Sequence, residues 1–113
     1  MSKKKIKLEV GKFYQAYGGN THPAKIYEKT SHGTYKSIKF GTSKGRHMIK
    51  IRPIQKGYDE SYVHTRPFEG ARSDYGNKEL LGLSINPSDN DLIERIKKNP
   101  SNKTTRARER YKK

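Results

Sequence analysis

The stretch TYKSIKFGTSKGRHMIKIR, residues 34–52, decides the fold of this chain. Polar and apolar residues alternate in its first part, where Ile38 and Phe40 fall on one face. They alternate again in its last part, where Ile49 and Ile51 share a face. A period of two is typical of a β-strand with one buried face, and the glycine- and serine-containing run between the two parts is typical of a turn. The stretch therefore predicts two strands joined by a loop, at residues 34–40 and 46–52.

Four further segments on either side of this stretch are also typical of strands. The first alternates Ile6, Leu8 and Val10 with charged residues, and the second is rich in aromatic residues. The third follows Pro23, and the fourth is stopped by Pro67. Six short strands with glycine-rich turns, in a chain too short for two large sheets, predict a small and strongly bent barrel. The four segments are residues 5–10, 13–17, 24–27 and 61–66.

The period changes near the end of the chain. Asn86 can cap a helix, Pro87 suits a first helical position, and acidic residues follow in the first turn. Leu92, Ile93 and Ile96 then form an apolar stripe at helical spacing. We predict one helix over residues 87–98 that packs on the barrel, so the predicted fold class is mainly β with one C-terminal helix.

The composition limits the protein to one small domain with a thin core. The chain has 113 residues, of which 29% are hydrophobic, and it contains no cysteine. Disulfide-stapled folds and zinc sites built on cysteine are therefore excluded. No apolar run approaches the roughly 20 residues that cross a bilayer, and the lysines at the start are not followed by the apolar region of a signal peptide. We expect a cytoplasmic protein that does not contact a membrane.

The charge is large and uneven. The net charge is +15, from 26 Lys and Arg against 11 Asp and Glu. Residues 1–8 hold four lysines and no acid, and residues 97–113 hold eight basic residues against Glu109. Basic ends bind polyanions by releasing counterions, which favours nucleic acid as the partner over a merely solubilising surface. We predict a basic arm at 1–8, one barrel domain with its helix at 9–98, and a basic disordered tail at 99–113.

Common catalytic and cofactor motifs do not occur in the chain. It has no phosphate-binding glycine loop, no nucleophile elbow and no H-E-x-x-H pair. The four histidines do not have ligand spacing on one helix, and the acids do not form a pair in the predicted strands. We therefore expect no metal and no cofactor.

Three segments stand out by their order and spacing, Thr21–Tyr27, Ile38–Arg46 and Ser61–Phe68. They resemble segments of the MazF/PemK-like toxin family, small SH3-like barrels that include metal-independent endoribonucleases. The run Leu80-Leu81-Gly82-Leu83 and the predicted helix resemble the L-G-x-L run and terminal helix with which that family closes. The resemblance covers residues 9–98 and implies an SH3-like barrel that acts on RNA.

The resemblance also assigns two catalytic positions. In the family a basic residue precedes a proline, and a small hydroxyl residue follows a strand and its glycine; His22 before Pro23 and Thr42 after Gly41 match these positions. The family has arginine where this chain has His22. Histidine exchanges protons near neutral pH, whereas arginine supplies a fixed cation that binds phosphate in two places. His22 therefore either preserves RNA cleavage, with a different chemical role from that of the arginine, or marks a protein of this type that binds RNA without cutting it. A turn hydroxyl at Thr42 and a pre-proline loop residue at His22 are the structural alternatives.

Other candidate residues follow from spacing and charge. Arg46 and His64 are candidates for charge and proton transfer, which completes a catalytic set with His22 and Thr42. Basic residues on predicted strands, loops and the tail are candidates for binding nucleic acid. These are Lys25, Lys44, Arg52, Arg66, Arg106, Arg108 and Arg110.

Two kinds of function are therefore expected. The first is a MazF/PemK-like endoribonuclease toxin, whose partners are RNA and an acidic antitoxin protein that covers the groove near His22 and Thr42. The second is a small barrel that binds RNA or DNA without cutting it, as a mobile-element protein or a structural subunit of a ribonucleoprotein does. A homodimer is also among the expected assemblies.

Overall fold

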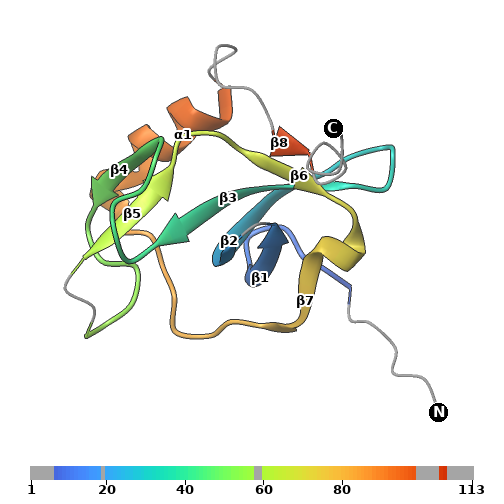
Figure 1. Cartoon of the computed structure of the whole chain (residues 1–113), viewed down its shortest axis with the longest axis horizontal. Helices are drawn as coiled ribbons and strands as arrows, with labels where there is room; N and C mark the ends of the chain where they lie inside the picture. Colours follow the sequence, from blue (N-terminus) through green and yellow to red (C-terminus); the bar gives the residue numbers. More distant parts are fainter. Residues whose placement is uncertain (1–6, 19, 58–59, 99–104, 107–113) are drawn as a thin grey trace.

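The computed structural model describes residues 7–18, 20–57, 60–98 and 105–106 (Figure 1). These residues form one bent β-sheet with a helix at one end. The helix α1 spans Asn90–Lys98 and is preceded by a short 3-10 turn at Pro87–Asp89. A second 3-10 turn spans Arg72–Asp74. The strands are β1 (Phe13–Gly18), β2 (Asn20–Lys29), β3 (Tyr35–Gly41), β4 (Met48–Ile51), β5 (Ser61–His64), β6 (Phe68–Gly70), β7 (Tyr75–Glu79) and β8 (Thr105–Arg106).

The strand β3 organises the sheet. Hydrogen bonds join the strands in the order β4-β5-β3-β2-β1-β7, and β6 pairs with β3 beside β5. The first residues of β3, Tyr35–Ser37, pair with β6, and its last residues, Phe40 and Gly41, pair with β5. These pairings are antiparallel, and only the short β8 pairs in parallel, with β6.

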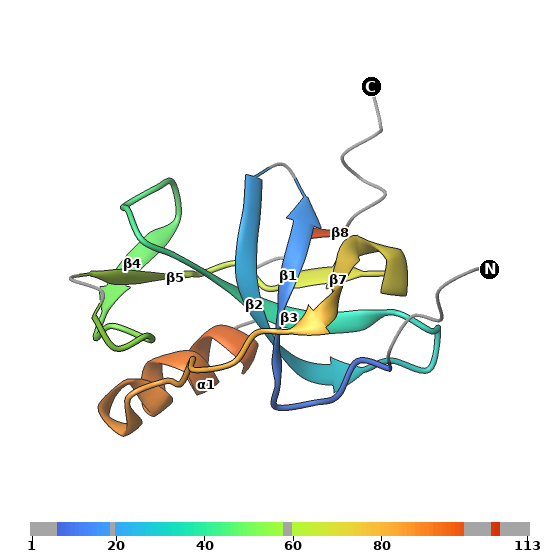
Figure 2. The same cartoon turned by 90° about the horizontal axis from the view of Figure 1, so that it is seen from below.

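The sheet is open, which corrects the predicted barrel. Among the described residues no ladder joins the end strands β4 and β7, although the sheet bends strongly between them (Figures 1 and 2). The physical reason is that β4 and β5 pair only with each other and with the end of β3. They extend away from the β1–β2 hairpin instead of returning to β7 (Figure 2).

The core lies on both faces of this sheet. Side chains alternate along a strand, so Tyr14 and Ala16 of β1 pack on one face, with Phe68 and Tyr75, while Phe13 packs on the other. The second face is covered by α1, whose Ile93 and Ile96 are 4% and 3% exposed. Their neighbours in that cluster are Phe13, Ile38, Phe40, Ile51, Ile54 and Val63.

Most of the predicted elements are present, and the helix is confirmed. Its first turn is a 3-10 turn in which the Asn86 side chain accepts a hydrogen bond from the Ser88 N–H at 3.0 Å. The strand predicted at 5–10 is wrong for its described residues, which have no strand pairing. Leu8 is buried there but Val10 is 60% exposed. The chain turns at Gly11, which has φ +93° and donates its N–H to the Ile26 carbonyl at 2.8 Å.

A buried tyrosine holds β3, β6 and β7 together and gives a test of the fold. The Tyr75 hydroxyl donates to the Tyr35 carbonyl at 3.0 Å and lies 3.0 Å from Ser37 Oγ. We expect Tyr75→Phe to lower the free energy of unfolding by about 1–3 kcal/mol, because it leaves buried polar groups without a partner. Urea denaturation followed by circular dichroism measures this. Tyr27→Phe is the control, since the Tyr27 hydroxyl has no hydrogen bond to any described residue. An equal loss of unfolding free energy in both variants would contradict the role of Tyr75.

The helix that the structure describes is too short and too polar to cross a membrane. In the segment 99–113, Thr105 and Arg106 form β8, and the remainder lies outside the described residues.

Candidate functional site

The candidate site lies where β2 and β3 separate. Their ladder ends at the pair Ala24–Lys39, and the residues of β2 before Ala24 pair only with β1. Beyond Lys39, the end of β3 pairs instead with β5. Pro23 fits in β2 because the strand has no partner on its β3 side there, so the missing N–H breaks no ladder. The two halves of the sheet therefore diverge, with the β1–β2 hairpin on one side and β3, β4 and β5 on the other (Figure 2).

A cleft of about 360 Å³ occupies this divergence. His22 and Pro23 of β2 line one wall together with Gln15 of β1. The opposite wall consists of the end of β3, the loop after it, and two buried residues from the β4–β5 half. None of the lining residues is acidic, so an anion entering the cleft meets no carboxylate on its walls. The full lining is Gln15, His22, Pro23, Gly41, Thr42, Ser43, Ile54 and Ser61.

His22 is placed to exchange a proton. Partial burial lowers the pKa of its imidazole, and the positive charge of Lys39 lowers that pKa further. The ring is therefore neutral at pH 7 and able to accept a proton. No described residue makes a hydrogen bond to it. The ring lies beside Gly41, where an added Cβ would be in ordinary contact with His22 Nδ1 at 3.7 Å and would crowd Met48 Cε at 3.0 Å.

His64 is near His22 but does not line the cleft. Burial is the main cause that lowers the pKa of His64, and the charges of Lys39, His47 and His22 act in the same direction. The Arg66 N–H donates to His64 Nδ1 at 3.2 Å, which places the proton of the neutral ring on Nε2. The His47 and His64 rings lie 6.4 Å apart between centroids.

His47 itself has an unusual backbone. It has φ +61°, in the left-handed region, and its carbonyl accepts both the N–H and the hydroxyl of Thr65, at 2.8 and 3.0 Å. These two hydrogen bonds hold the loop after β3 against the end of β5, and so fix one side of the cleft entrance.

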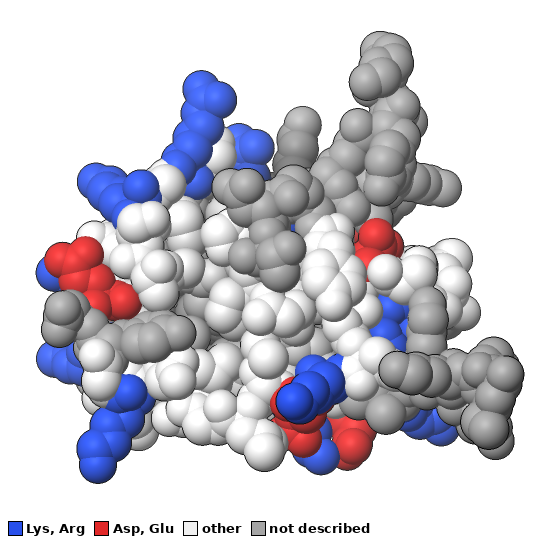
Figure 3. All heavy atoms as spheres, turned by 60° about the horizontal axis from the view of Figure 1, so that its bottom comes forward, with Lys and Arg blue, Asp and Glu red and all other residues white. Residues whose placement is uncertain are grey.

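Exposed cations stand beside the cleft in the same loop. Lys44 and Arg46 follow Thr42 and Ser43, and all four residues are exposed. Arg46 does not line the cleft, so the structure brings together His22 and Thr42 of the predicted catalytic set and leaves Arg46 and His64 nearby. On the face in Figure 3, Lys and Arg side chains, with some Asp and Glu side chains among them, stand around the margin of an area of mostly uncharged atoms.

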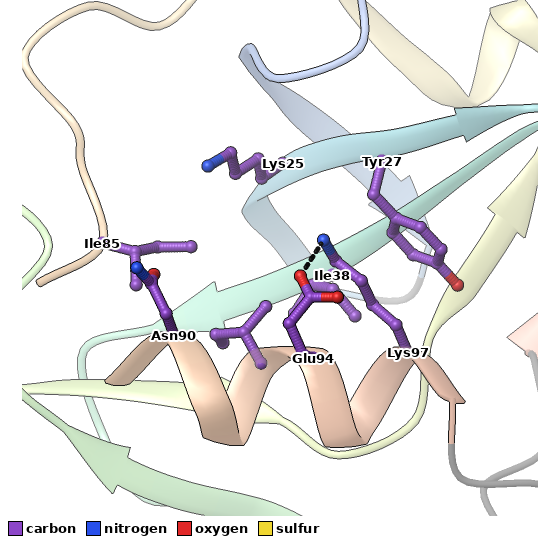
Figure 4. Close-up of a pocket in the computed structure, with 8 residues that line it drawn as sticks. Lys25, Tyr27, Ile38, Ile85, Asn90, Glu94 and Lys97 are labelled. Carbon is purple, nitrogen blue, oxygen red and sulfur yellow. Dashed lines mark hydrogen bonds and ion pairs between the residues drawn. The ribbon is translucent and has the colours of Figure 1, made fainter. Parts of the chain in front are cut away.

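Lys25 lies in a different place from the other candidate binding residues. It belongs to β2 and lines a small cavity of about 50 Å³ together with residues of α1 (Figure 4). Its ammonium group lies 5.8 Å from the centre of the Phe13 ring, and burial lowers its pKa, as does the charge of Lys97. In the same cavity Lys97 Nζ pairs with Glu94 Oε2 at 2.9 Å.

The remaining candidate cations are dispersed. Arg52 is exposed and lies 3.9 Å from Asp89 Oδ1, while Arg66 is exposed after β5. Arg106 belongs to β8, and Arg108 and Arg110 lie outside the described residues. The described ranges contain no group of three or more His, Asp or Glu side chains placed to hold a metal ion.

Sequence reasoning missed three residues of the cleft, Gln15, Ile54 and Ser61. Ser61 is fully buried, and its Oγ accepts the Ile54 N–H at 2.9 Å, which ties the chain after β4 to the start of β5. Gln15 lines the opposite wall, and its side-chain oxygen is buried with no hydrogen-bond partner among the described residues. The aromatic run around Gln15 marked a strand, but no sequence signal indicated which of its residues would face a cleft.

Comparison of the whole chain with protein-family models, with curated proteins and with solved structures gives no match.

Proposed function

We propose that this protein is a metal-independent endoribonuclease of the MazF/PemK-like toxin type, with an SH3-like fold, and that RNA is cleaved in the cleft between β2 and the loop after β3. The observation that carries the proposal is the meeting of His22 and Thr42 in one cleft without acidic walls. These residues are 20 positions apart in the sequence and were paired only by the resemblance to that family.

The chemistry is an attack of the RNA 2′-hydroxyl on the neighbouring phosphorus. The bond from phosphorus to the 5′-oxygen breaks, and the products end in a 2′,3′-cyclic phosphate and a 5′-hydroxyl. The reaction needs a proton acceptor, a proton donor and stabilisation of the negative charge on the phosphorane. Each requirement has a candidate among the residues in or near the cleft.

The neutral imidazole of His22 takes the proton of the 2′-hydroxyl, a role that its lowered pKa supports. His64, whose neutral ring carries its hydrogen on Nε2, is the candidate hydrogen-bond donor to the leaving 5′-oxygen, and that oxygen takes up its proton from water. Thr42, in the loop after β3, donates a hydrogen bond to the phosphate. Lys44 and Arg46 of the same loop supply positive charge at the entrance to the cleft. The fixed arginine cation of the family is thus replaced by a proton acceptor and by charge from the loop.

An acidic antitoxin is the protein partner that this proposal implies. The cleft lacks carboxylates, and the loop at its entrance carries Lys44 and Arg46. An acidic segment laid across that loop would neutralise these charges and exclude RNA from the cleft.

The proposal is tested by incubating the purified protein with mixed-sequence RNA in EDTA, because a 2′-hydroxyl mechanism needs no metal. We expect cleavage to 5′-hydroxyl products, and a loss of about 10²-fold or more in Thr42→Ala, in which one phosphate-binding donor is removed. Ser31→Ala, a change at an exposed hydroxyl in the β2–β3 turn, is the matched control and leaves the rate unchanged.

Binding without cleavage would overturn this proposal. In that case RNA binds with an affinity that falls steeply as the salt concentration rises, and no cleavage product forms in EDTA with either the wild-type protein or Thr42→Ala. The protein is then a nucleic-acid-binding module, the second function that the sequence predicts.

A further inference from the structure

The cleft contains an unsatisfied hydrogen-bonding group that the proposed chemistry does not use. Gln15 Oε1 is buried and has no hydrogen-bond partner in the part of the chain that the structure describes. Buried polar atoms in folded proteins almost always have partners, so an acceptor without one on a cleft wall is a place where a donor of a ligand, or a water molecule, can bind. The terminal torsion of glutamine is broad, so the amide can turn its oxygen or its nitrogen toward the cleft.

The surroundings of Gln15 are suited to a planar ring. Tyr17 is two residues further along β1 and therefore on the same face of the strand, and it is 49% exposed. Both side chains pass over Gly76 of β7, where an added Cβ would lie 3.0 Å from Tyr17 Oη and 3.4 Å from Gln15 Cβ. The glycine therefore provides the space that the hydroxyl end of Tyr17 occupies beside the stem of Gln15, at the margin of the cleft.

We propose that Gln15 is the specificity-determining residue of the cleft and that it selects an adenine next to the scissile phosphate, with Tyr17 as the ring on which that base stacks. The amide oxygen accepts the exocyclic N6–H of adenine, and the amide nitrogen donates to N7, a pairing for which glutamine has the matching geometry. Bases splayed out of single-stranded RNA are read in this way, by hydrogen bonds at their edges and by stacking on aromatic side chains.

The orphaned oxygen gives the selection its physical basis. The acceptor has no partner among the described residues, and a base with a hydrogen-bond donor at the matching position would supply one, whereas a base with an acceptor there would not. The ring N–H of uracil lies between two carbonyl oxygens, which would approach the same acceptor and repel it. The amino group of adenine has no such neighbours on its N7 side.

The inference rests on the proposed function, because it places the base beside the phosphate that is cleaved. The test uses oligouridine strands with a single central adenosine, and counterparts that carry purine riboside, which lacks the N6 amino group, or 7-deazaadenosine, which lacks N7. Cleavage is measured as kcat/KM. Binding is measured separately by fluorescence anisotropy, on 2′-deoxy versions that cannot be cut.

We expect each altered base to reduce binding by about 5- to 150-fold relative to adenine, the range for loss of a bidentate contact. In Gln15→Leu the three bases bind alike. Gln15→Glu, which keeps an acceptor and loses the donor, still distinguishes adenine from purine riboside but no longer distinguishes it from 7-deazaadenine. Gln55→Leu, at the other glutamine of the chain, which does not line the cleft, keeps the preference.

The two proposals fail in different ways. Cleavage next to every base with equal efficiency, or an adenine preference that survives in Gln15→Leu, overturns the role of Gln15 and leaves the ribonuclease intact. An adenine preference in binding that depends on Gln15, with no cleavage of any ribose strand, supports the role of Gln15 and overturns the ribonuclease. Melting curves of the variants show whether each is folded. Gln15→Leu is expected to fold, because the change removes from the cleft wall a polar atom that has no partner among the described residues.

Discussion

His22→Ala is expected to lower the rate of RNA cleavage by about 10²- to 10⁴-fold, the contribution typical of a positioned general acid or base. The side chain lines the cleft opposite Thr42, and no other described histidine does so. Its removal therefore leaves the 2′-hydroxyl without a proton acceptor on that wall. The rate is measured with a fluorescent RNA under single-turnover conditions, so that slow product release does not hide the loss.

The pH dependence of the same rate tests the assigned role. Burial and Lys39 hold the pKa of His22 below 6.5, and the neutral ring is the form that accepts a proton. The rate of the wild-type protein is therefore expected to be constant above that pKa and to fall tenfold per unit as the pH drops below it. The residual rate of His22→Ala is expected to have no such acid limb.

Two further variants separate catalysis from charge. His32→Ala changes an exposed histidine in the β2–β3 turn and is expected to leave the rate unchanged. His22→Arg places at this position the residue that the toxin family has, and it is expected to lose activity as His22→Ala does, because arginine stays protonated and cannot accept the proton. A wild-type acid limb that persists in His22→Ala would show that another group is the proton acceptor.

The placement of the candidate site could be predicted only in part. Strand alternation located β3 and β5, and the resemblance to a toxin family paired His22 with Thr42, so the meeting of these two residues was anticipated. The sequence did not predict that β2 diverges from β3, because this divergence depends on which strand pairs with each end of β3. That choice is made by contacts between distant residues, such as Phe40 with Val63 and Ser37 with Phe68.

Local patterns were also misleading where tertiary contacts decide the outcome. The strands β6 and β7 have little apolar alternation, and β7 is held by one buried tyrosine, Tyr75, and by pairing with β1. In the predicted strand 46–52, Ile49 and Ile51 have the same spacing as a buried pair. Only Ile51 is covered, at 5% exposure against 42% for Ile49, because the edge position of β4 leaves its outer part without a neighbouring element.

Phe40→Ala is expected to lower the free energy of unfolding by about 3–5 kcal/mol, the cost of emptying a large aromatic site in a core. The Phe40 side chain has no exposed surface and packs against Phe13, with 5.7 Å between the ring centroids. Its backbone pairs with Val63, in the ladder that joins the two halves of the sheet. Small domains have total free energies of unfolding of about 5–15 kcal/mol, so this loss removes a large part of the stability of the protein.

The cleft should respond to this change more than the rest of the fold, because Gly41 and Thr42 follow Phe40 directly and form one of its walls. Hydrogen exchange of the backbone amides of β3, β4 and β5, together with guanidinium denaturation, measures both effects. Ile49→Ala on the neighbouring strand β4 is the matched control and is expected to change stability by about 0.5 kcal/mol or less, as exposed substitutions do. If Phe40→Ala is no less stable than Ile49→Ala, the two halves of the sheet are not held together through the Phe40 cluster, and the walls of the cleft are fixed by the loop contacts of His47 instead.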